Sequence, residues 1–138
     1  MRQREAVFVD SGAWIALALS RDPLHEQARE QWELLKESAS KLHTSLPVVI
    51  ETFTFLDRNA NRDVALSWKE SIHQPGVVKV LPCELRDLEQ SWEYFRRADL
   101  RKLSAVDATS FTIMKRARIR IAFTFDHHFA AAGYRLVG

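Results

Sequence analysis

The sequence predicts an α/β fold with three layers, α/β/α, in which helices cover both faces of a parallel sheet of about five strands. Short apolar runs alternate along the chain with segments whose apolar residues recur at helical spacing. The runs within residues 6–10 and 121–124 are apolar on both faces, which is typical of strands buried in a parallel sheet. In such sheets, ligands bind beyond the carboxyl ends of the strands.

Five segments are predicted as strands because they are short and rich in apolar or β-branched residues. They are residues 6–10, 41–44, 77–81, 121–124 and 134–137. Longer segments with helical spacing separate them. The predicted helices are residues 11–19, a helix beginning at Asp22-Pro23, 47–58, a helix capped by Asn61, 84–97, a helix beginning at Ser104, and 127–132.

Helix starts are predicted from local chemistry. Asp22 is expected as an N-cap with Pro23 at the first helical position, and Asn61 as the cap of a later helix. The tryptophans, Trp14, Trp32, Trp68 and Trp92, lie on apolar helix faces, so we expect them in the core. For Trp32 or Trp68, together with Phe53, Phe55 and Leu56, the alternative is that they face a partner.

The length of 138 residues favours a single domain, residues 1–138. With 46% hydrophobic and 28% charged residues, the chain belongs to the soluble globular class. Its net charge of +2 is compatible with a nucleic-acid partner. Cys83 is the only cysteine, which excludes an intramolecular disulfide and a cysteine-based zinc site. The sequence contains no apolar stretch of membrane-spanning length and no signal peptide, so we expect a cytoplasmic protein.

Four acidic residues carry the functional argument. Asp10 and Asp126 close the apolar runs that end at Val9 and Phe125. Glu51 follows an apolar run after residue 45, and Asp107 lies three residues past Ser104. Ionised groups next to a core are costly unless they are paired or bound to a metal. The pattern therefore suggests a metal site.

Each acid also has a simpler interpretation as a helix cap or as a first-turn residue that interacts with the helix dipole, worth ~0.3–1 kcal/mol. Four caps have no reason to converge, however. Two carboxylates ~4 Å apart repel by about 4 kcal/mol at an effective dielectric near 20. Converging acids therefore either take up protons or bind divalent cations. All-oxygen ligands suit Mg²⁺ or Mn²⁺, and these ions promote hydrolysis of phosphodiesters.

At this point the chain resembles a known family. The segments that carry the resemblance are Phe8-Val9-Asp10-Ser11-Gly12, Val49-Ile50-Glu51, Leu103-Ser104-Ala105-Val106-Asp107-Ala108 and Thr124-Phe125-Asp126-His127-His128-Phe129. They are similar, in order and over essentially the whole chain, to the four acidic motifs of PIN-domain ribonucleases. The nearest likeness within that group is to the VapC-type toxins of toxin–antitoxin modules.

The resemblance implies an endoribonuclease that depends on Mg²⁺ or Mn²⁺ and leaves a 5′-phosphate and a 3′-hydroxyl, a homodimer, and an antitoxin that blocks the site. By position, Asp10, Glu51, Asp107 and Asp126 match the catalytic, metal-binding acids. The resemblance also implies supporting roles for small polar residues and one further acid, namely Ser11, Asp99, Ser104 and Thr124.

Basic residues and histidines near these motifs have open assignments. Arg101 and Lys102, close to Asp107, could hold RNA phosphates, or they could belong to a solvated face. For a second basic cluster we favour a solvated face; its members are Lys115, Arg116, Arg118 and Arg120. His127 and His128 could act as metal or acid–base groups, but a metal that activates water makes a histidine unnecessary.

Two other functions remain as alternatives. A PIN ribonuclease could process or degrade RNA without being a toxin, and a short antitoxin gene upstream would separate these two cases. A non-catalytic, receiver-like domain would also use an acidic pocket, but it would need paired acids after the first strand and a lysine after a late one. Asp10 stands alone, and no lysine follows residues 121–125. An Asp-x-Asp phosphatase fails because position 12 is Gly.

Overall fold

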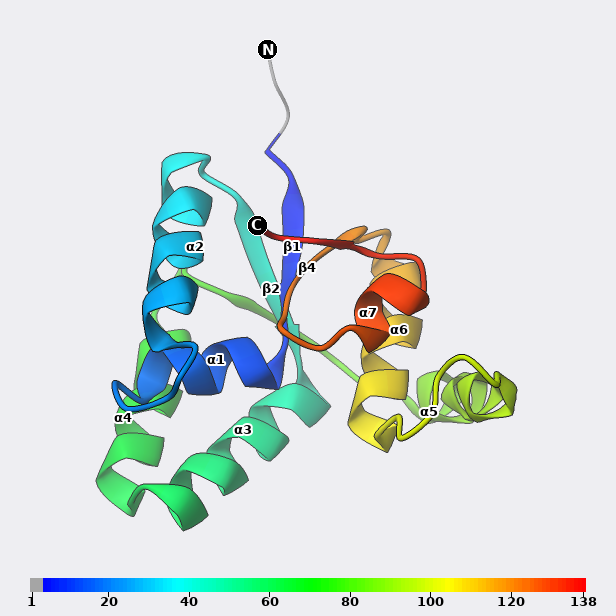
Figure 1. The fold of residues 1–138 in the computed structure, drawn as a ribbon, viewed down its shortest axis with the longest axis horizontal. Coiled ribbons are helices and arrows are strands. Elements are labelled where there is room, and N and C mark those ends of the chain that lie inside the picture. The colour runs from blue at the N-terminus through cyan, green and yellow to red at the C-terminus, as the bar shows by residue number, and fades with distance from the viewer. Residues whose placement is uncertain (1–3) are drawn as a thin grey trace.

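The computed structural model describes residues 4–138, which form a five-stranded sheet covered by helices (Figure 1). The strands are β1 (Ala6–Val9), β2 (Lys41–Ser45), β3 (Lys79–Leu81), β4 (Ile121–Phe123) and β5 (Arg135–Leu136). The helices are α1 (Ser11–Ala18), α2 (His25–Glu37), α3 (Leu46–Asn59), α4 (Arg62–Ile72), α5 (Leu85–Ser91), the 3₁₀ helix η1 (Trp92–Arg96), α6 (Ala105–Ala117) and α7 (His128–Ala131).

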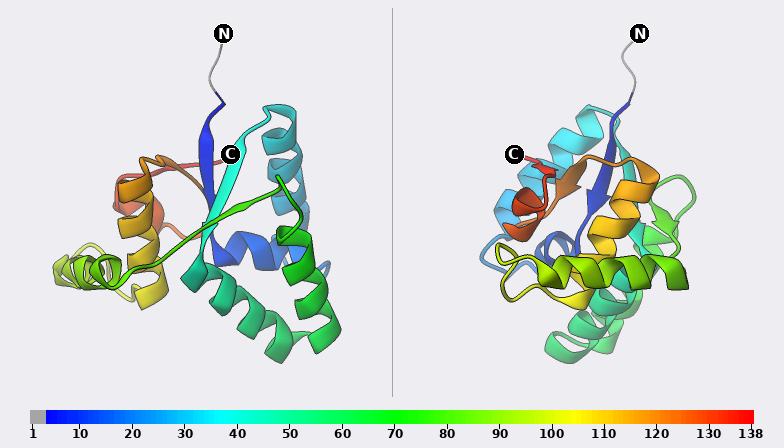
Figure 2. Two further views of the ribbon diagram at one scale, coloured as in Figure 1. Left: turned by 180° about the vertical axis from the view of Figure 1, so that it is seen from behind. Right: turned by 90° about the vertical axis from the view of Figure 1, so that its right-hand side faces the viewer.

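The sheet has the strand order β3-β2-β1-β4-β5, and every neighbouring pair is parallel. Helices α1, α2 and α4 lie on one side of the sheet, and α5, α6 and α7 lie on the other (Figures 1 and 2). Parallel strands require such crossover helices, which cover both faces of the sheet. The predicted three-layer α/β/α fold is confirmed.

Within residues 4–138, three helices begin at a serine or asparagine whose side chain accepts a backbone hydrogen bond. Ser45 accepts a hydrogen bond from the N–H of Val48 at the start of α3, and Asn61 accepts one from Val64 at the start of α4. Ser104 accepts one from the N–H of Asp107 at the start of α6. These bonds satisfy N–H groups that have no partner within the helix. The predicted starts at Asn61 and Ser104 are therefore confirmed.

The predicted start at Asp22-Pro23 is wrong. Helix α2 begins at His25, and its N-cap, Leu24, makes no side-chain capping bond. Asp22 instead accepts a hydrogen bond from the N–H of Leu24, at 2.8 Å, which closes a turn ahead of the helix. The strand predicted at 77–81 is also shorter than expected, since β3 begins at Lys79.

The helix predicted at residues 84–97 is divided into α5 and η1, and it packs through its polar side. Asp87 is 1% exposed and pairs with Arg116 of α6 at 3.1 Å, while Ser91 is buried against Thr112 of the same helix. Trp92 is consequently 48% exposed, so its expected place in the core is wrong. The local sequence pattern places Asp87 and Ser91 on the solvent side of the helix, but Arg116 and Thr112 of α6 form polar contacts with them in the folded protein.

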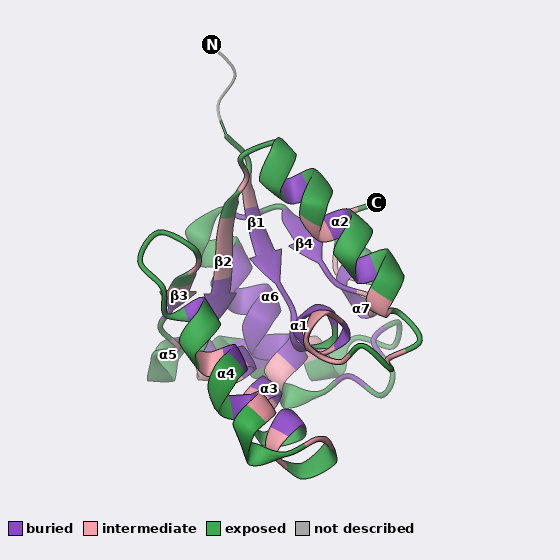
Figure 3. Ribbon diagram, turned by 90° about the vertical axis from the view of Figure 1, so that its left-hand side faces the viewer, coloured by how far each residue is buried: buried purple, intermediate pink, exposed green. Residues whose placement is uncertain are grey.

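The core lies between the sheet and the two helical layers (Figure 3). Its largest fully buried side chains include Phe8, Phe111, Phe123 and Phe129, from β1, α6, β4 and α7. Burying each of these relative to leaving it exposed contributes about 1.5–3 kcal/mol. None of the helices within residues 4–138 is long and apolar enough to cross a membrane.

Candidate metal centre

The sheet topology brings acids from distant parts of the chain to one edge. β1 and β4 are neighbours with Val9 opposite Phe123, so Asp10 and Asp126 both follow the carboxyl ends of adjacent strands. Glu51 lies in the second turn of α3, which continues directly from β2, and Asp107 is the third residue of α6. Helix α3 leaves the sheet at this same end (Figures 1 and 2).

Asp10 is the most enclosed of these acids, with 3% exposure. Its Oδ2 accepts a hydrogen bond from the Thr124 hydroxyl at 3.0 Å, whereas its buried Oδ1 has no partner within residues 4–138. Burial raises the pKa of Asp10 to about 6, and the negative charges of Glu51 and Asp126 act in the same direction. Although Asp10 is the N-cap residue of α1, its side chain makes no capping hydrogen bond, so helix capping does not explain it.

Glu51 is joined to the first motif through the residue after Asp10. The Ser11 hydroxyl donates a hydrogen bond to Glu51 Oε1 at 2.5 Å, between residues 40 positions apart in the chain. Glu51 is half-buried, and its charge acts on Asp10. Ser11 therefore fixes the fourth acid beside the other three.

Asp107 is 8% exposed and lies against two other acids. Burial is the largest cause that raises its pKa, and the charges of Asp10 and Asp126 add to it. Together they raise the pKa of Asp107 to about 8. The Ser104 hydroxyl accepts from its N–H at 3.0 Å, so the cap of α6 also positions this acid. In the absence of a cation, Asp107 is the carboxylate that holds a proton near neutral pH.

Asp126 is held in place by its neighbours in the turn before α7. Its N–H donates to the Thr124 hydroxyl, and its Oδ1 accepts from the N–H of His128 at 2.9 Å. Burial opposes ionisation of Asp126, but the N–H and ring of His128 and the contact with Asp107 outweigh it and lower its pKa. Asp126 thus stays ionised while Asp107 is protonated.

His128 is a site residue whose importance the sequence understated. It is 7% exposed, with Nδ1 at 2.7 Å from Asp126 Oδ1 and Nε2 at 2.6 Å from the carbonyl oxygen of Arg101. Since a carbonyl oxygen only accepts, Nε2 carries a proton and Nδ1 faces the carboxylate. The bond to Arg101 raises the pKa of His128, and Asp126 adds to this. Both ring nitrogens are engaged, so His128 orients Asp126, as groups behind metal ligands commonly do.

The donors at this edge fit a hard divalent cation. Carboxylate oxygens of Asp107 and Asp126 lie within 4.8 Å of each other, and the His128 ring that orients Asp126 lies in the same cluster. Asp10 contributes a buried carboxylate oxygen without a hydrogen-bond donor, which is costly to leave unsatisfied unless a cation or a proton occupies it. Carboxylate oxygens are ligands that Mg²⁺ and Mn²⁺ prefer.

The other predicted residues divide into two groups. Ser11, Ser104 and Thr124 hydrogen-bond to the acids or to the backbone beside them. Asp99 is exposed and bound through both carboxylate oxygens to Arg97, and no hydrogen bond among residues 4–138 joins it to the four acids. Arg101 and Lys102 are exposed on the segment that His128 contacts, so they lie beside the acidic edge.

The PIN domain family matches residues 7–133, a span that contains all four acids. The chain belongs to this family. Over 131 residues it is 37% identical to the 23S rRNA-specific endonuclease VapC20 of Mycobacterium tuberculosis, in strains CDC 1551 / Oshkosh and H37Rv, covering 93% of this chain and 95% of VapC20. The expected family resemblance is confirmed, and PIN membership replaces the receiver-like and phosphatase interpretations.

Solved structures agree with this assignment. The crystal structure of Mycobacterium tuberculosis VapC20, a sarcin-ricin loop cleaving toxin, matches with a TM-score of 0.81 and 35% identity, covering 93% of this chain and 95% of that one. VapBC2 from Rickettsia felis, bound to a DNA fragment from its promoter, matches with a TM-score of 0.70 at 10% identity over 95% of this chain and 96% of that one. The second likeness shows the shared fold.

Proposed function

We propose that this PIN domain is a metal-dependent endoribonuclease and the toxin of a VapBC-type toxin–antitoxin pair. One observation carries the catalytic part: among residues 4–138, Asp10 has a buried carboxylate oxygen without a hydrogen-bond partner, and this oxygen belongs to a side chain beside Asp107 and Asp126 at the carboxyl edge of the sheet. The identity to VapC20 supports RNA as the substrate and ribosomal RNA as the first RNA to test.

In the proposed mechanism, Asp10, Asp107 and Asp126 hold Mg²⁺ or Mn²⁺, and Glu51 completes the site or accepts a proton from the attacking water. A bound cation supplies two effects: it lowers the pKa of water and stabilises negative charge on the phosphate. The chain's own task is to orient its acids, whose raised pKa values mean that a cation would displace the protons of Asp10 and Asp107. Ser11 directs Glu51, Thr124 directs Asp10, and His128 directs Asp126.

The substrate backbone must approach an edge that is itself negative, so nearby cationic groups are needed. Arg101 and Lys102 are exposed on the segment whose backbone His128 contacts. We assign them to the phosphates that flank the scissile bond. Such contacts position an RNA without reading its sequence.

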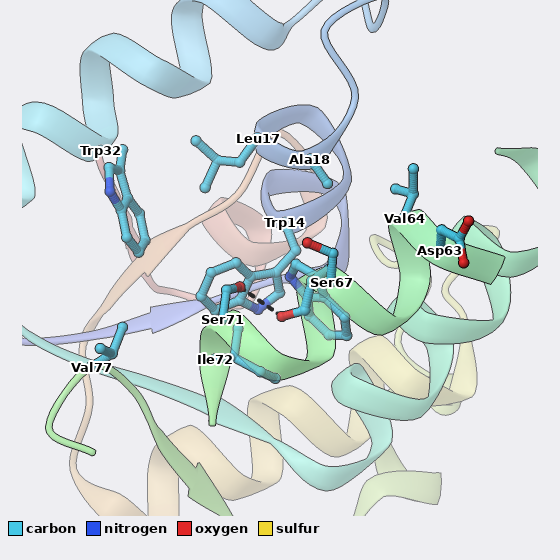
Figure 4. Close-up of a pocket in the computed structure, with 11 residues that line it drawn as sticks. Trp14, Leu17, Ala18, Trp32, Asp63, Val64, Ser67, Ser71, Ile72 and Val77 are labelled. Atoms are coloured by element: carbon cyan, nitrogen blue, oxygen red, sulfur yellow. Dashed lines mark hydrogen bonds between the residues drawn. The ribbon is translucent and has the colours of Figure 1, made fainter. Parts of the chain in front are cut away.

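The antitoxin part of the proposal concerns an apolar groove of about 610 Å³ between α1, α2 and α4 (Figure 4). Trp14 lies between Trp32 and Trp68, with ring centroids 5.8 and 5.9 Å away. We propose that apolar side chains of the antitoxin fill this groove. Of the alternative partner-facing residues, Trp32 and Trp68 line it, whereas Leu56 is fully buried and has no surface to offer.

We also propose a homodimer in which a second copy covers apolar side chains close to Glu51. Leu46, Ile50 and Phe55 of α3 are 47%, 59% and 40% exposed. Exposed apolar clusters of this kind mark protein contacts more often than free surface. Sedimentation of the protein and of Ile50→Glu tests this step, since the charged variant is expected to be monomeric.

The deciding experiment incubates purified protein with total tRNA and rRNA in the presence of Mg²⁺, Mn²⁺ or EDTA and maps the cut ends. We expect discrete cuts that leave 5′-phosphates, require the added ion and disappear in EDTA. Cleavage that persists unchanged in EDTA would contradict the metal-dependent mechanism. The alternative of a PIN ribonuclease that is not a toxin is favoured if the protein cleaves RNA without inhibiting growth and no antitoxin gene adjoins its own.

A further inference from the structure

A cluster of arginines lies at the opposite end of the sheet from the acids. A hollow of about 550 Å³ is lined by Arg4 ahead of β1, Arg118 and Arg120 between α6 and β4, and Arg135 of β5. The start of β1 and the turn from α6 into β4 both lie at the upper end of the molecule in Figure 1, away from α3. We call this set the arginine hollow.

Most of this positive charge is not neutralised within the described chain. Arg135 pairs with Glu5 at 3.0 Å, and this is the one acid that lines the hollow. Arg4, Arg118 and Arg120 are exposed and have no carboxylate within salt-bridge distance among residues 4–138. Three unpaired guanidinium groups around one concavity produce a field that attracts anions.

The chemistry of the hollow favours a nucleic-acid backbone over an acidic peptide. Apart from Glu5 and the arginines, the hollow is lined by Ala6, Ile121 and Gly133. These few apolar groups do not form the deep apolar pockets that anchor peptides. Guanidinium groups present paired N–H donors that match phosphate oxygens. Four arginines that line one hollow can contact several phosphates of a backbone, whereas a single carboxylate would use only one of them.

We propose that the arginine hollow is a second RNA-binding surface, which holds the phosphate backbone of a structured RNA at a distance from the cut. The inference rests on the proposed ribonuclease function and extends it to substrate selection. It assigns a role to Arg118 and Arg120, for which the sequence favoured a solvated face. Arg116 is excluded because it is bound to the buried Asp87.

The distance between the two sites predicts which RNAs can use both. The five steps from Glu5 to Asp10 along β1, at about 3.3 Å per residue, separate the hollow from the acids by roughly 16 Å. Nucleotides advance by about 3.4 Å each along a strand of B-DNA and by no more in an RNA helix, so a helical RNA must contribute at least about five of them to span this length. Shorter oligonucleotides reach the acids alone.

Arg118 permits an unusually clean charge removal. It is the C-cap of α6 and adopts a left-handed conformation with φ +59°, which favours glycine over residues with a side chain. Arg118→Gly therefore removes a charge without a folding penalty. We combine it with Arg120→Gln, and the matched control is Arg29→Gln with Lys36→Gln on α2, which removes the same charge from exposed side chains.

Binding is measured without cleavage, in an Asp10→Asn background, with a fluorescently labelled rRNA fragment between 50 and 200 mM KCl, a range over which phosphate contacts change affinity by orders of magnitude. We expect the Arg118→Gly/Arg120→Gln protein to bind about tenfold more weakly at low salt, and its salt slope to fall by about 1.4–1.8 for two lost contacts, from the single-stranded to the duplex limit. The control pair should match the unmodified background. The proposal would be overturned if the salt slope of Arg118→Gly/Arg120→Gln equalled that of the Arg29→Gln/Lys36→Gln control.

A kinetic arm separates this proposal from the proposed function. With Asp10 intact, Arg118→Gly/Arg120→Gln should raise KM for the long RNA about tenfold and leave kcat unchanged, with no change on a four-nucleotide substrate. Cleavage by the unmodified protein together with no effect of the pair overturns the arginine hollow alone. Absence of any cleavage, with binding still dependent on the pair, overturns the ribonuclease and supports the hollow. If the pair loses affinity for a poly-glutamate peptide but not for RNA, the hollow serves an acidic protein and the proposal is wrong.

Discussion

The protein uses aspartate in two contrasting ways. At the carboxyl edge of the sheet, Asp10 and Asp107 have pKa values raised by burial and by neighbouring acids, to about 6 and about 8. On the surface, Asp57 and Asp99 each bind an arginine guanidinium, which lowers their pKa. The surface acids are matched with cations from their own chain, whereas the edge acids face one another. An arrangement that costs stability in this way is typical of a functional site.

The contrast also clarifies Asp99, which the family resemblance placed among the supporting residues. Its carboxylate is already satisfied by Arg97, which in addition donates to the carbonyl oxygen of Ala131, the last residue of α7. Asp99 can therefore support the site by fixing the position of Arg97 and the nearby backbone. Direct contact with a cation would require breaking a two-point ion pair.

The largest expected difference in RNA cleavage is between a variant of an edge aspartate and a variant of an arginine-paired surface aspartate. Asp10→Asn removes a charge that the site needs, so we expect cleavage of RNA to fall about a thousandfold or more. Because the pKa of Asp10 is raised to about 6, the neutral amide resembles its protonated form and the fold should persist. Asp57→Asn, which loses an exposed pair with Arg62, should cleave at the normal rate.

The measurement is the initial rate of RNA cleavage, with circular dichroism as the check on folding. A folded Asp10→Asn protein with normal activity that is abolished by EDTA would remove Asp10 from the mechanism.

The edge aspartates should also make the metal-free protein less stable as the pH rises. Their pKa values are raised in the folded state, so that state binds more protons than the unfolded chain above pH 4. Stability is therefore lost between pH 4 and about 6 for Asp10, and up to about 8 for Asp107. A shift of about two units at Asp10 corresponds to about 3 kcal/mol. The acids paired with arginine act in the opposite direction.

Urea unfolding in EDTA at pH 5 and pH 8 measures this effect. The variant Asp107→Asn separates the contribution of Asp107 from that of the histidines. The unfolding free energy of this variant should vary less with pH than that of the unmodified protein. Added Mg²⁺ should restore stability at pH 8, because a cation replaces the protons. An unfolding free energy that has the same pH dependence in both proteins would contradict the assigned pKa of Asp107.

The sequence predicts the acidic edge well because its signals are local. Asp10 follows a wholly apolar strand, and Ser104 lies three residues ahead of Asp107, so the end of β1 and the start of α6 are both visible in the chain. The convergence of Asp10 and Asp126 then follows from parallel strand topology, whereas Glu51 and Asp107 are brought in by α3 and α6. The prediction for α5 is wrong for the opposite reason. Asp87 and Ser91 have local hydrogen bonds within α5 and its N-cap, but their burial also depends on Arg116 and Thr112 of α6, and no local pattern contains those partners.

The role of His128 could be predicted only in part from the sequence. The two-residue spacing from Asp126 allows one carboxylate to meet both the backbone N–H and the ring, and that spacing is visible in the sequence. Its second contact, with the carbonyl oxygen of Arg101, joins positions 27 residues apart and appears only in the fold. The two-residue spacing alone indicates a capped turn. The contact with Arg101, which is distant in the sequence, is what shows that His128 positions Asp126.

His128→Ala should therefore weaken the site without abolishing it. Loss of the ring frees Asp126 from its orientation, and we expect cleavage to fall about 10–100-fold, with a similar increase in the Mg²⁺ concentration that gives half-maximal rate. His127→Ala, which alters an exposed neighbour, is the control. The metal titration is the decisive measurement, because a purely structural loss would lower the rate at every Mg²⁺ concentration and leave the midpoint unchanged.

Thr124 should give the smallest effect, because its hydroxyl supports the acids through single hydrogen bonds. It donates to Asp10 Oδ2 and accepts from the N–H of Asp126, each at 3.0 Å. Thr124→Val keeps the shape but removes both bonds, so cleavage should fall by about tenfold, which corresponds to roughly 0.7 kcal/mol for each of the two hydrogen bonds. Thr124→Ser keeps the hydroxyl and should retain most of the activity. Equal rates for the two variants would mean that the hydroxyl is not what position 124 contributes, and that burial alone holds Asp10 in place.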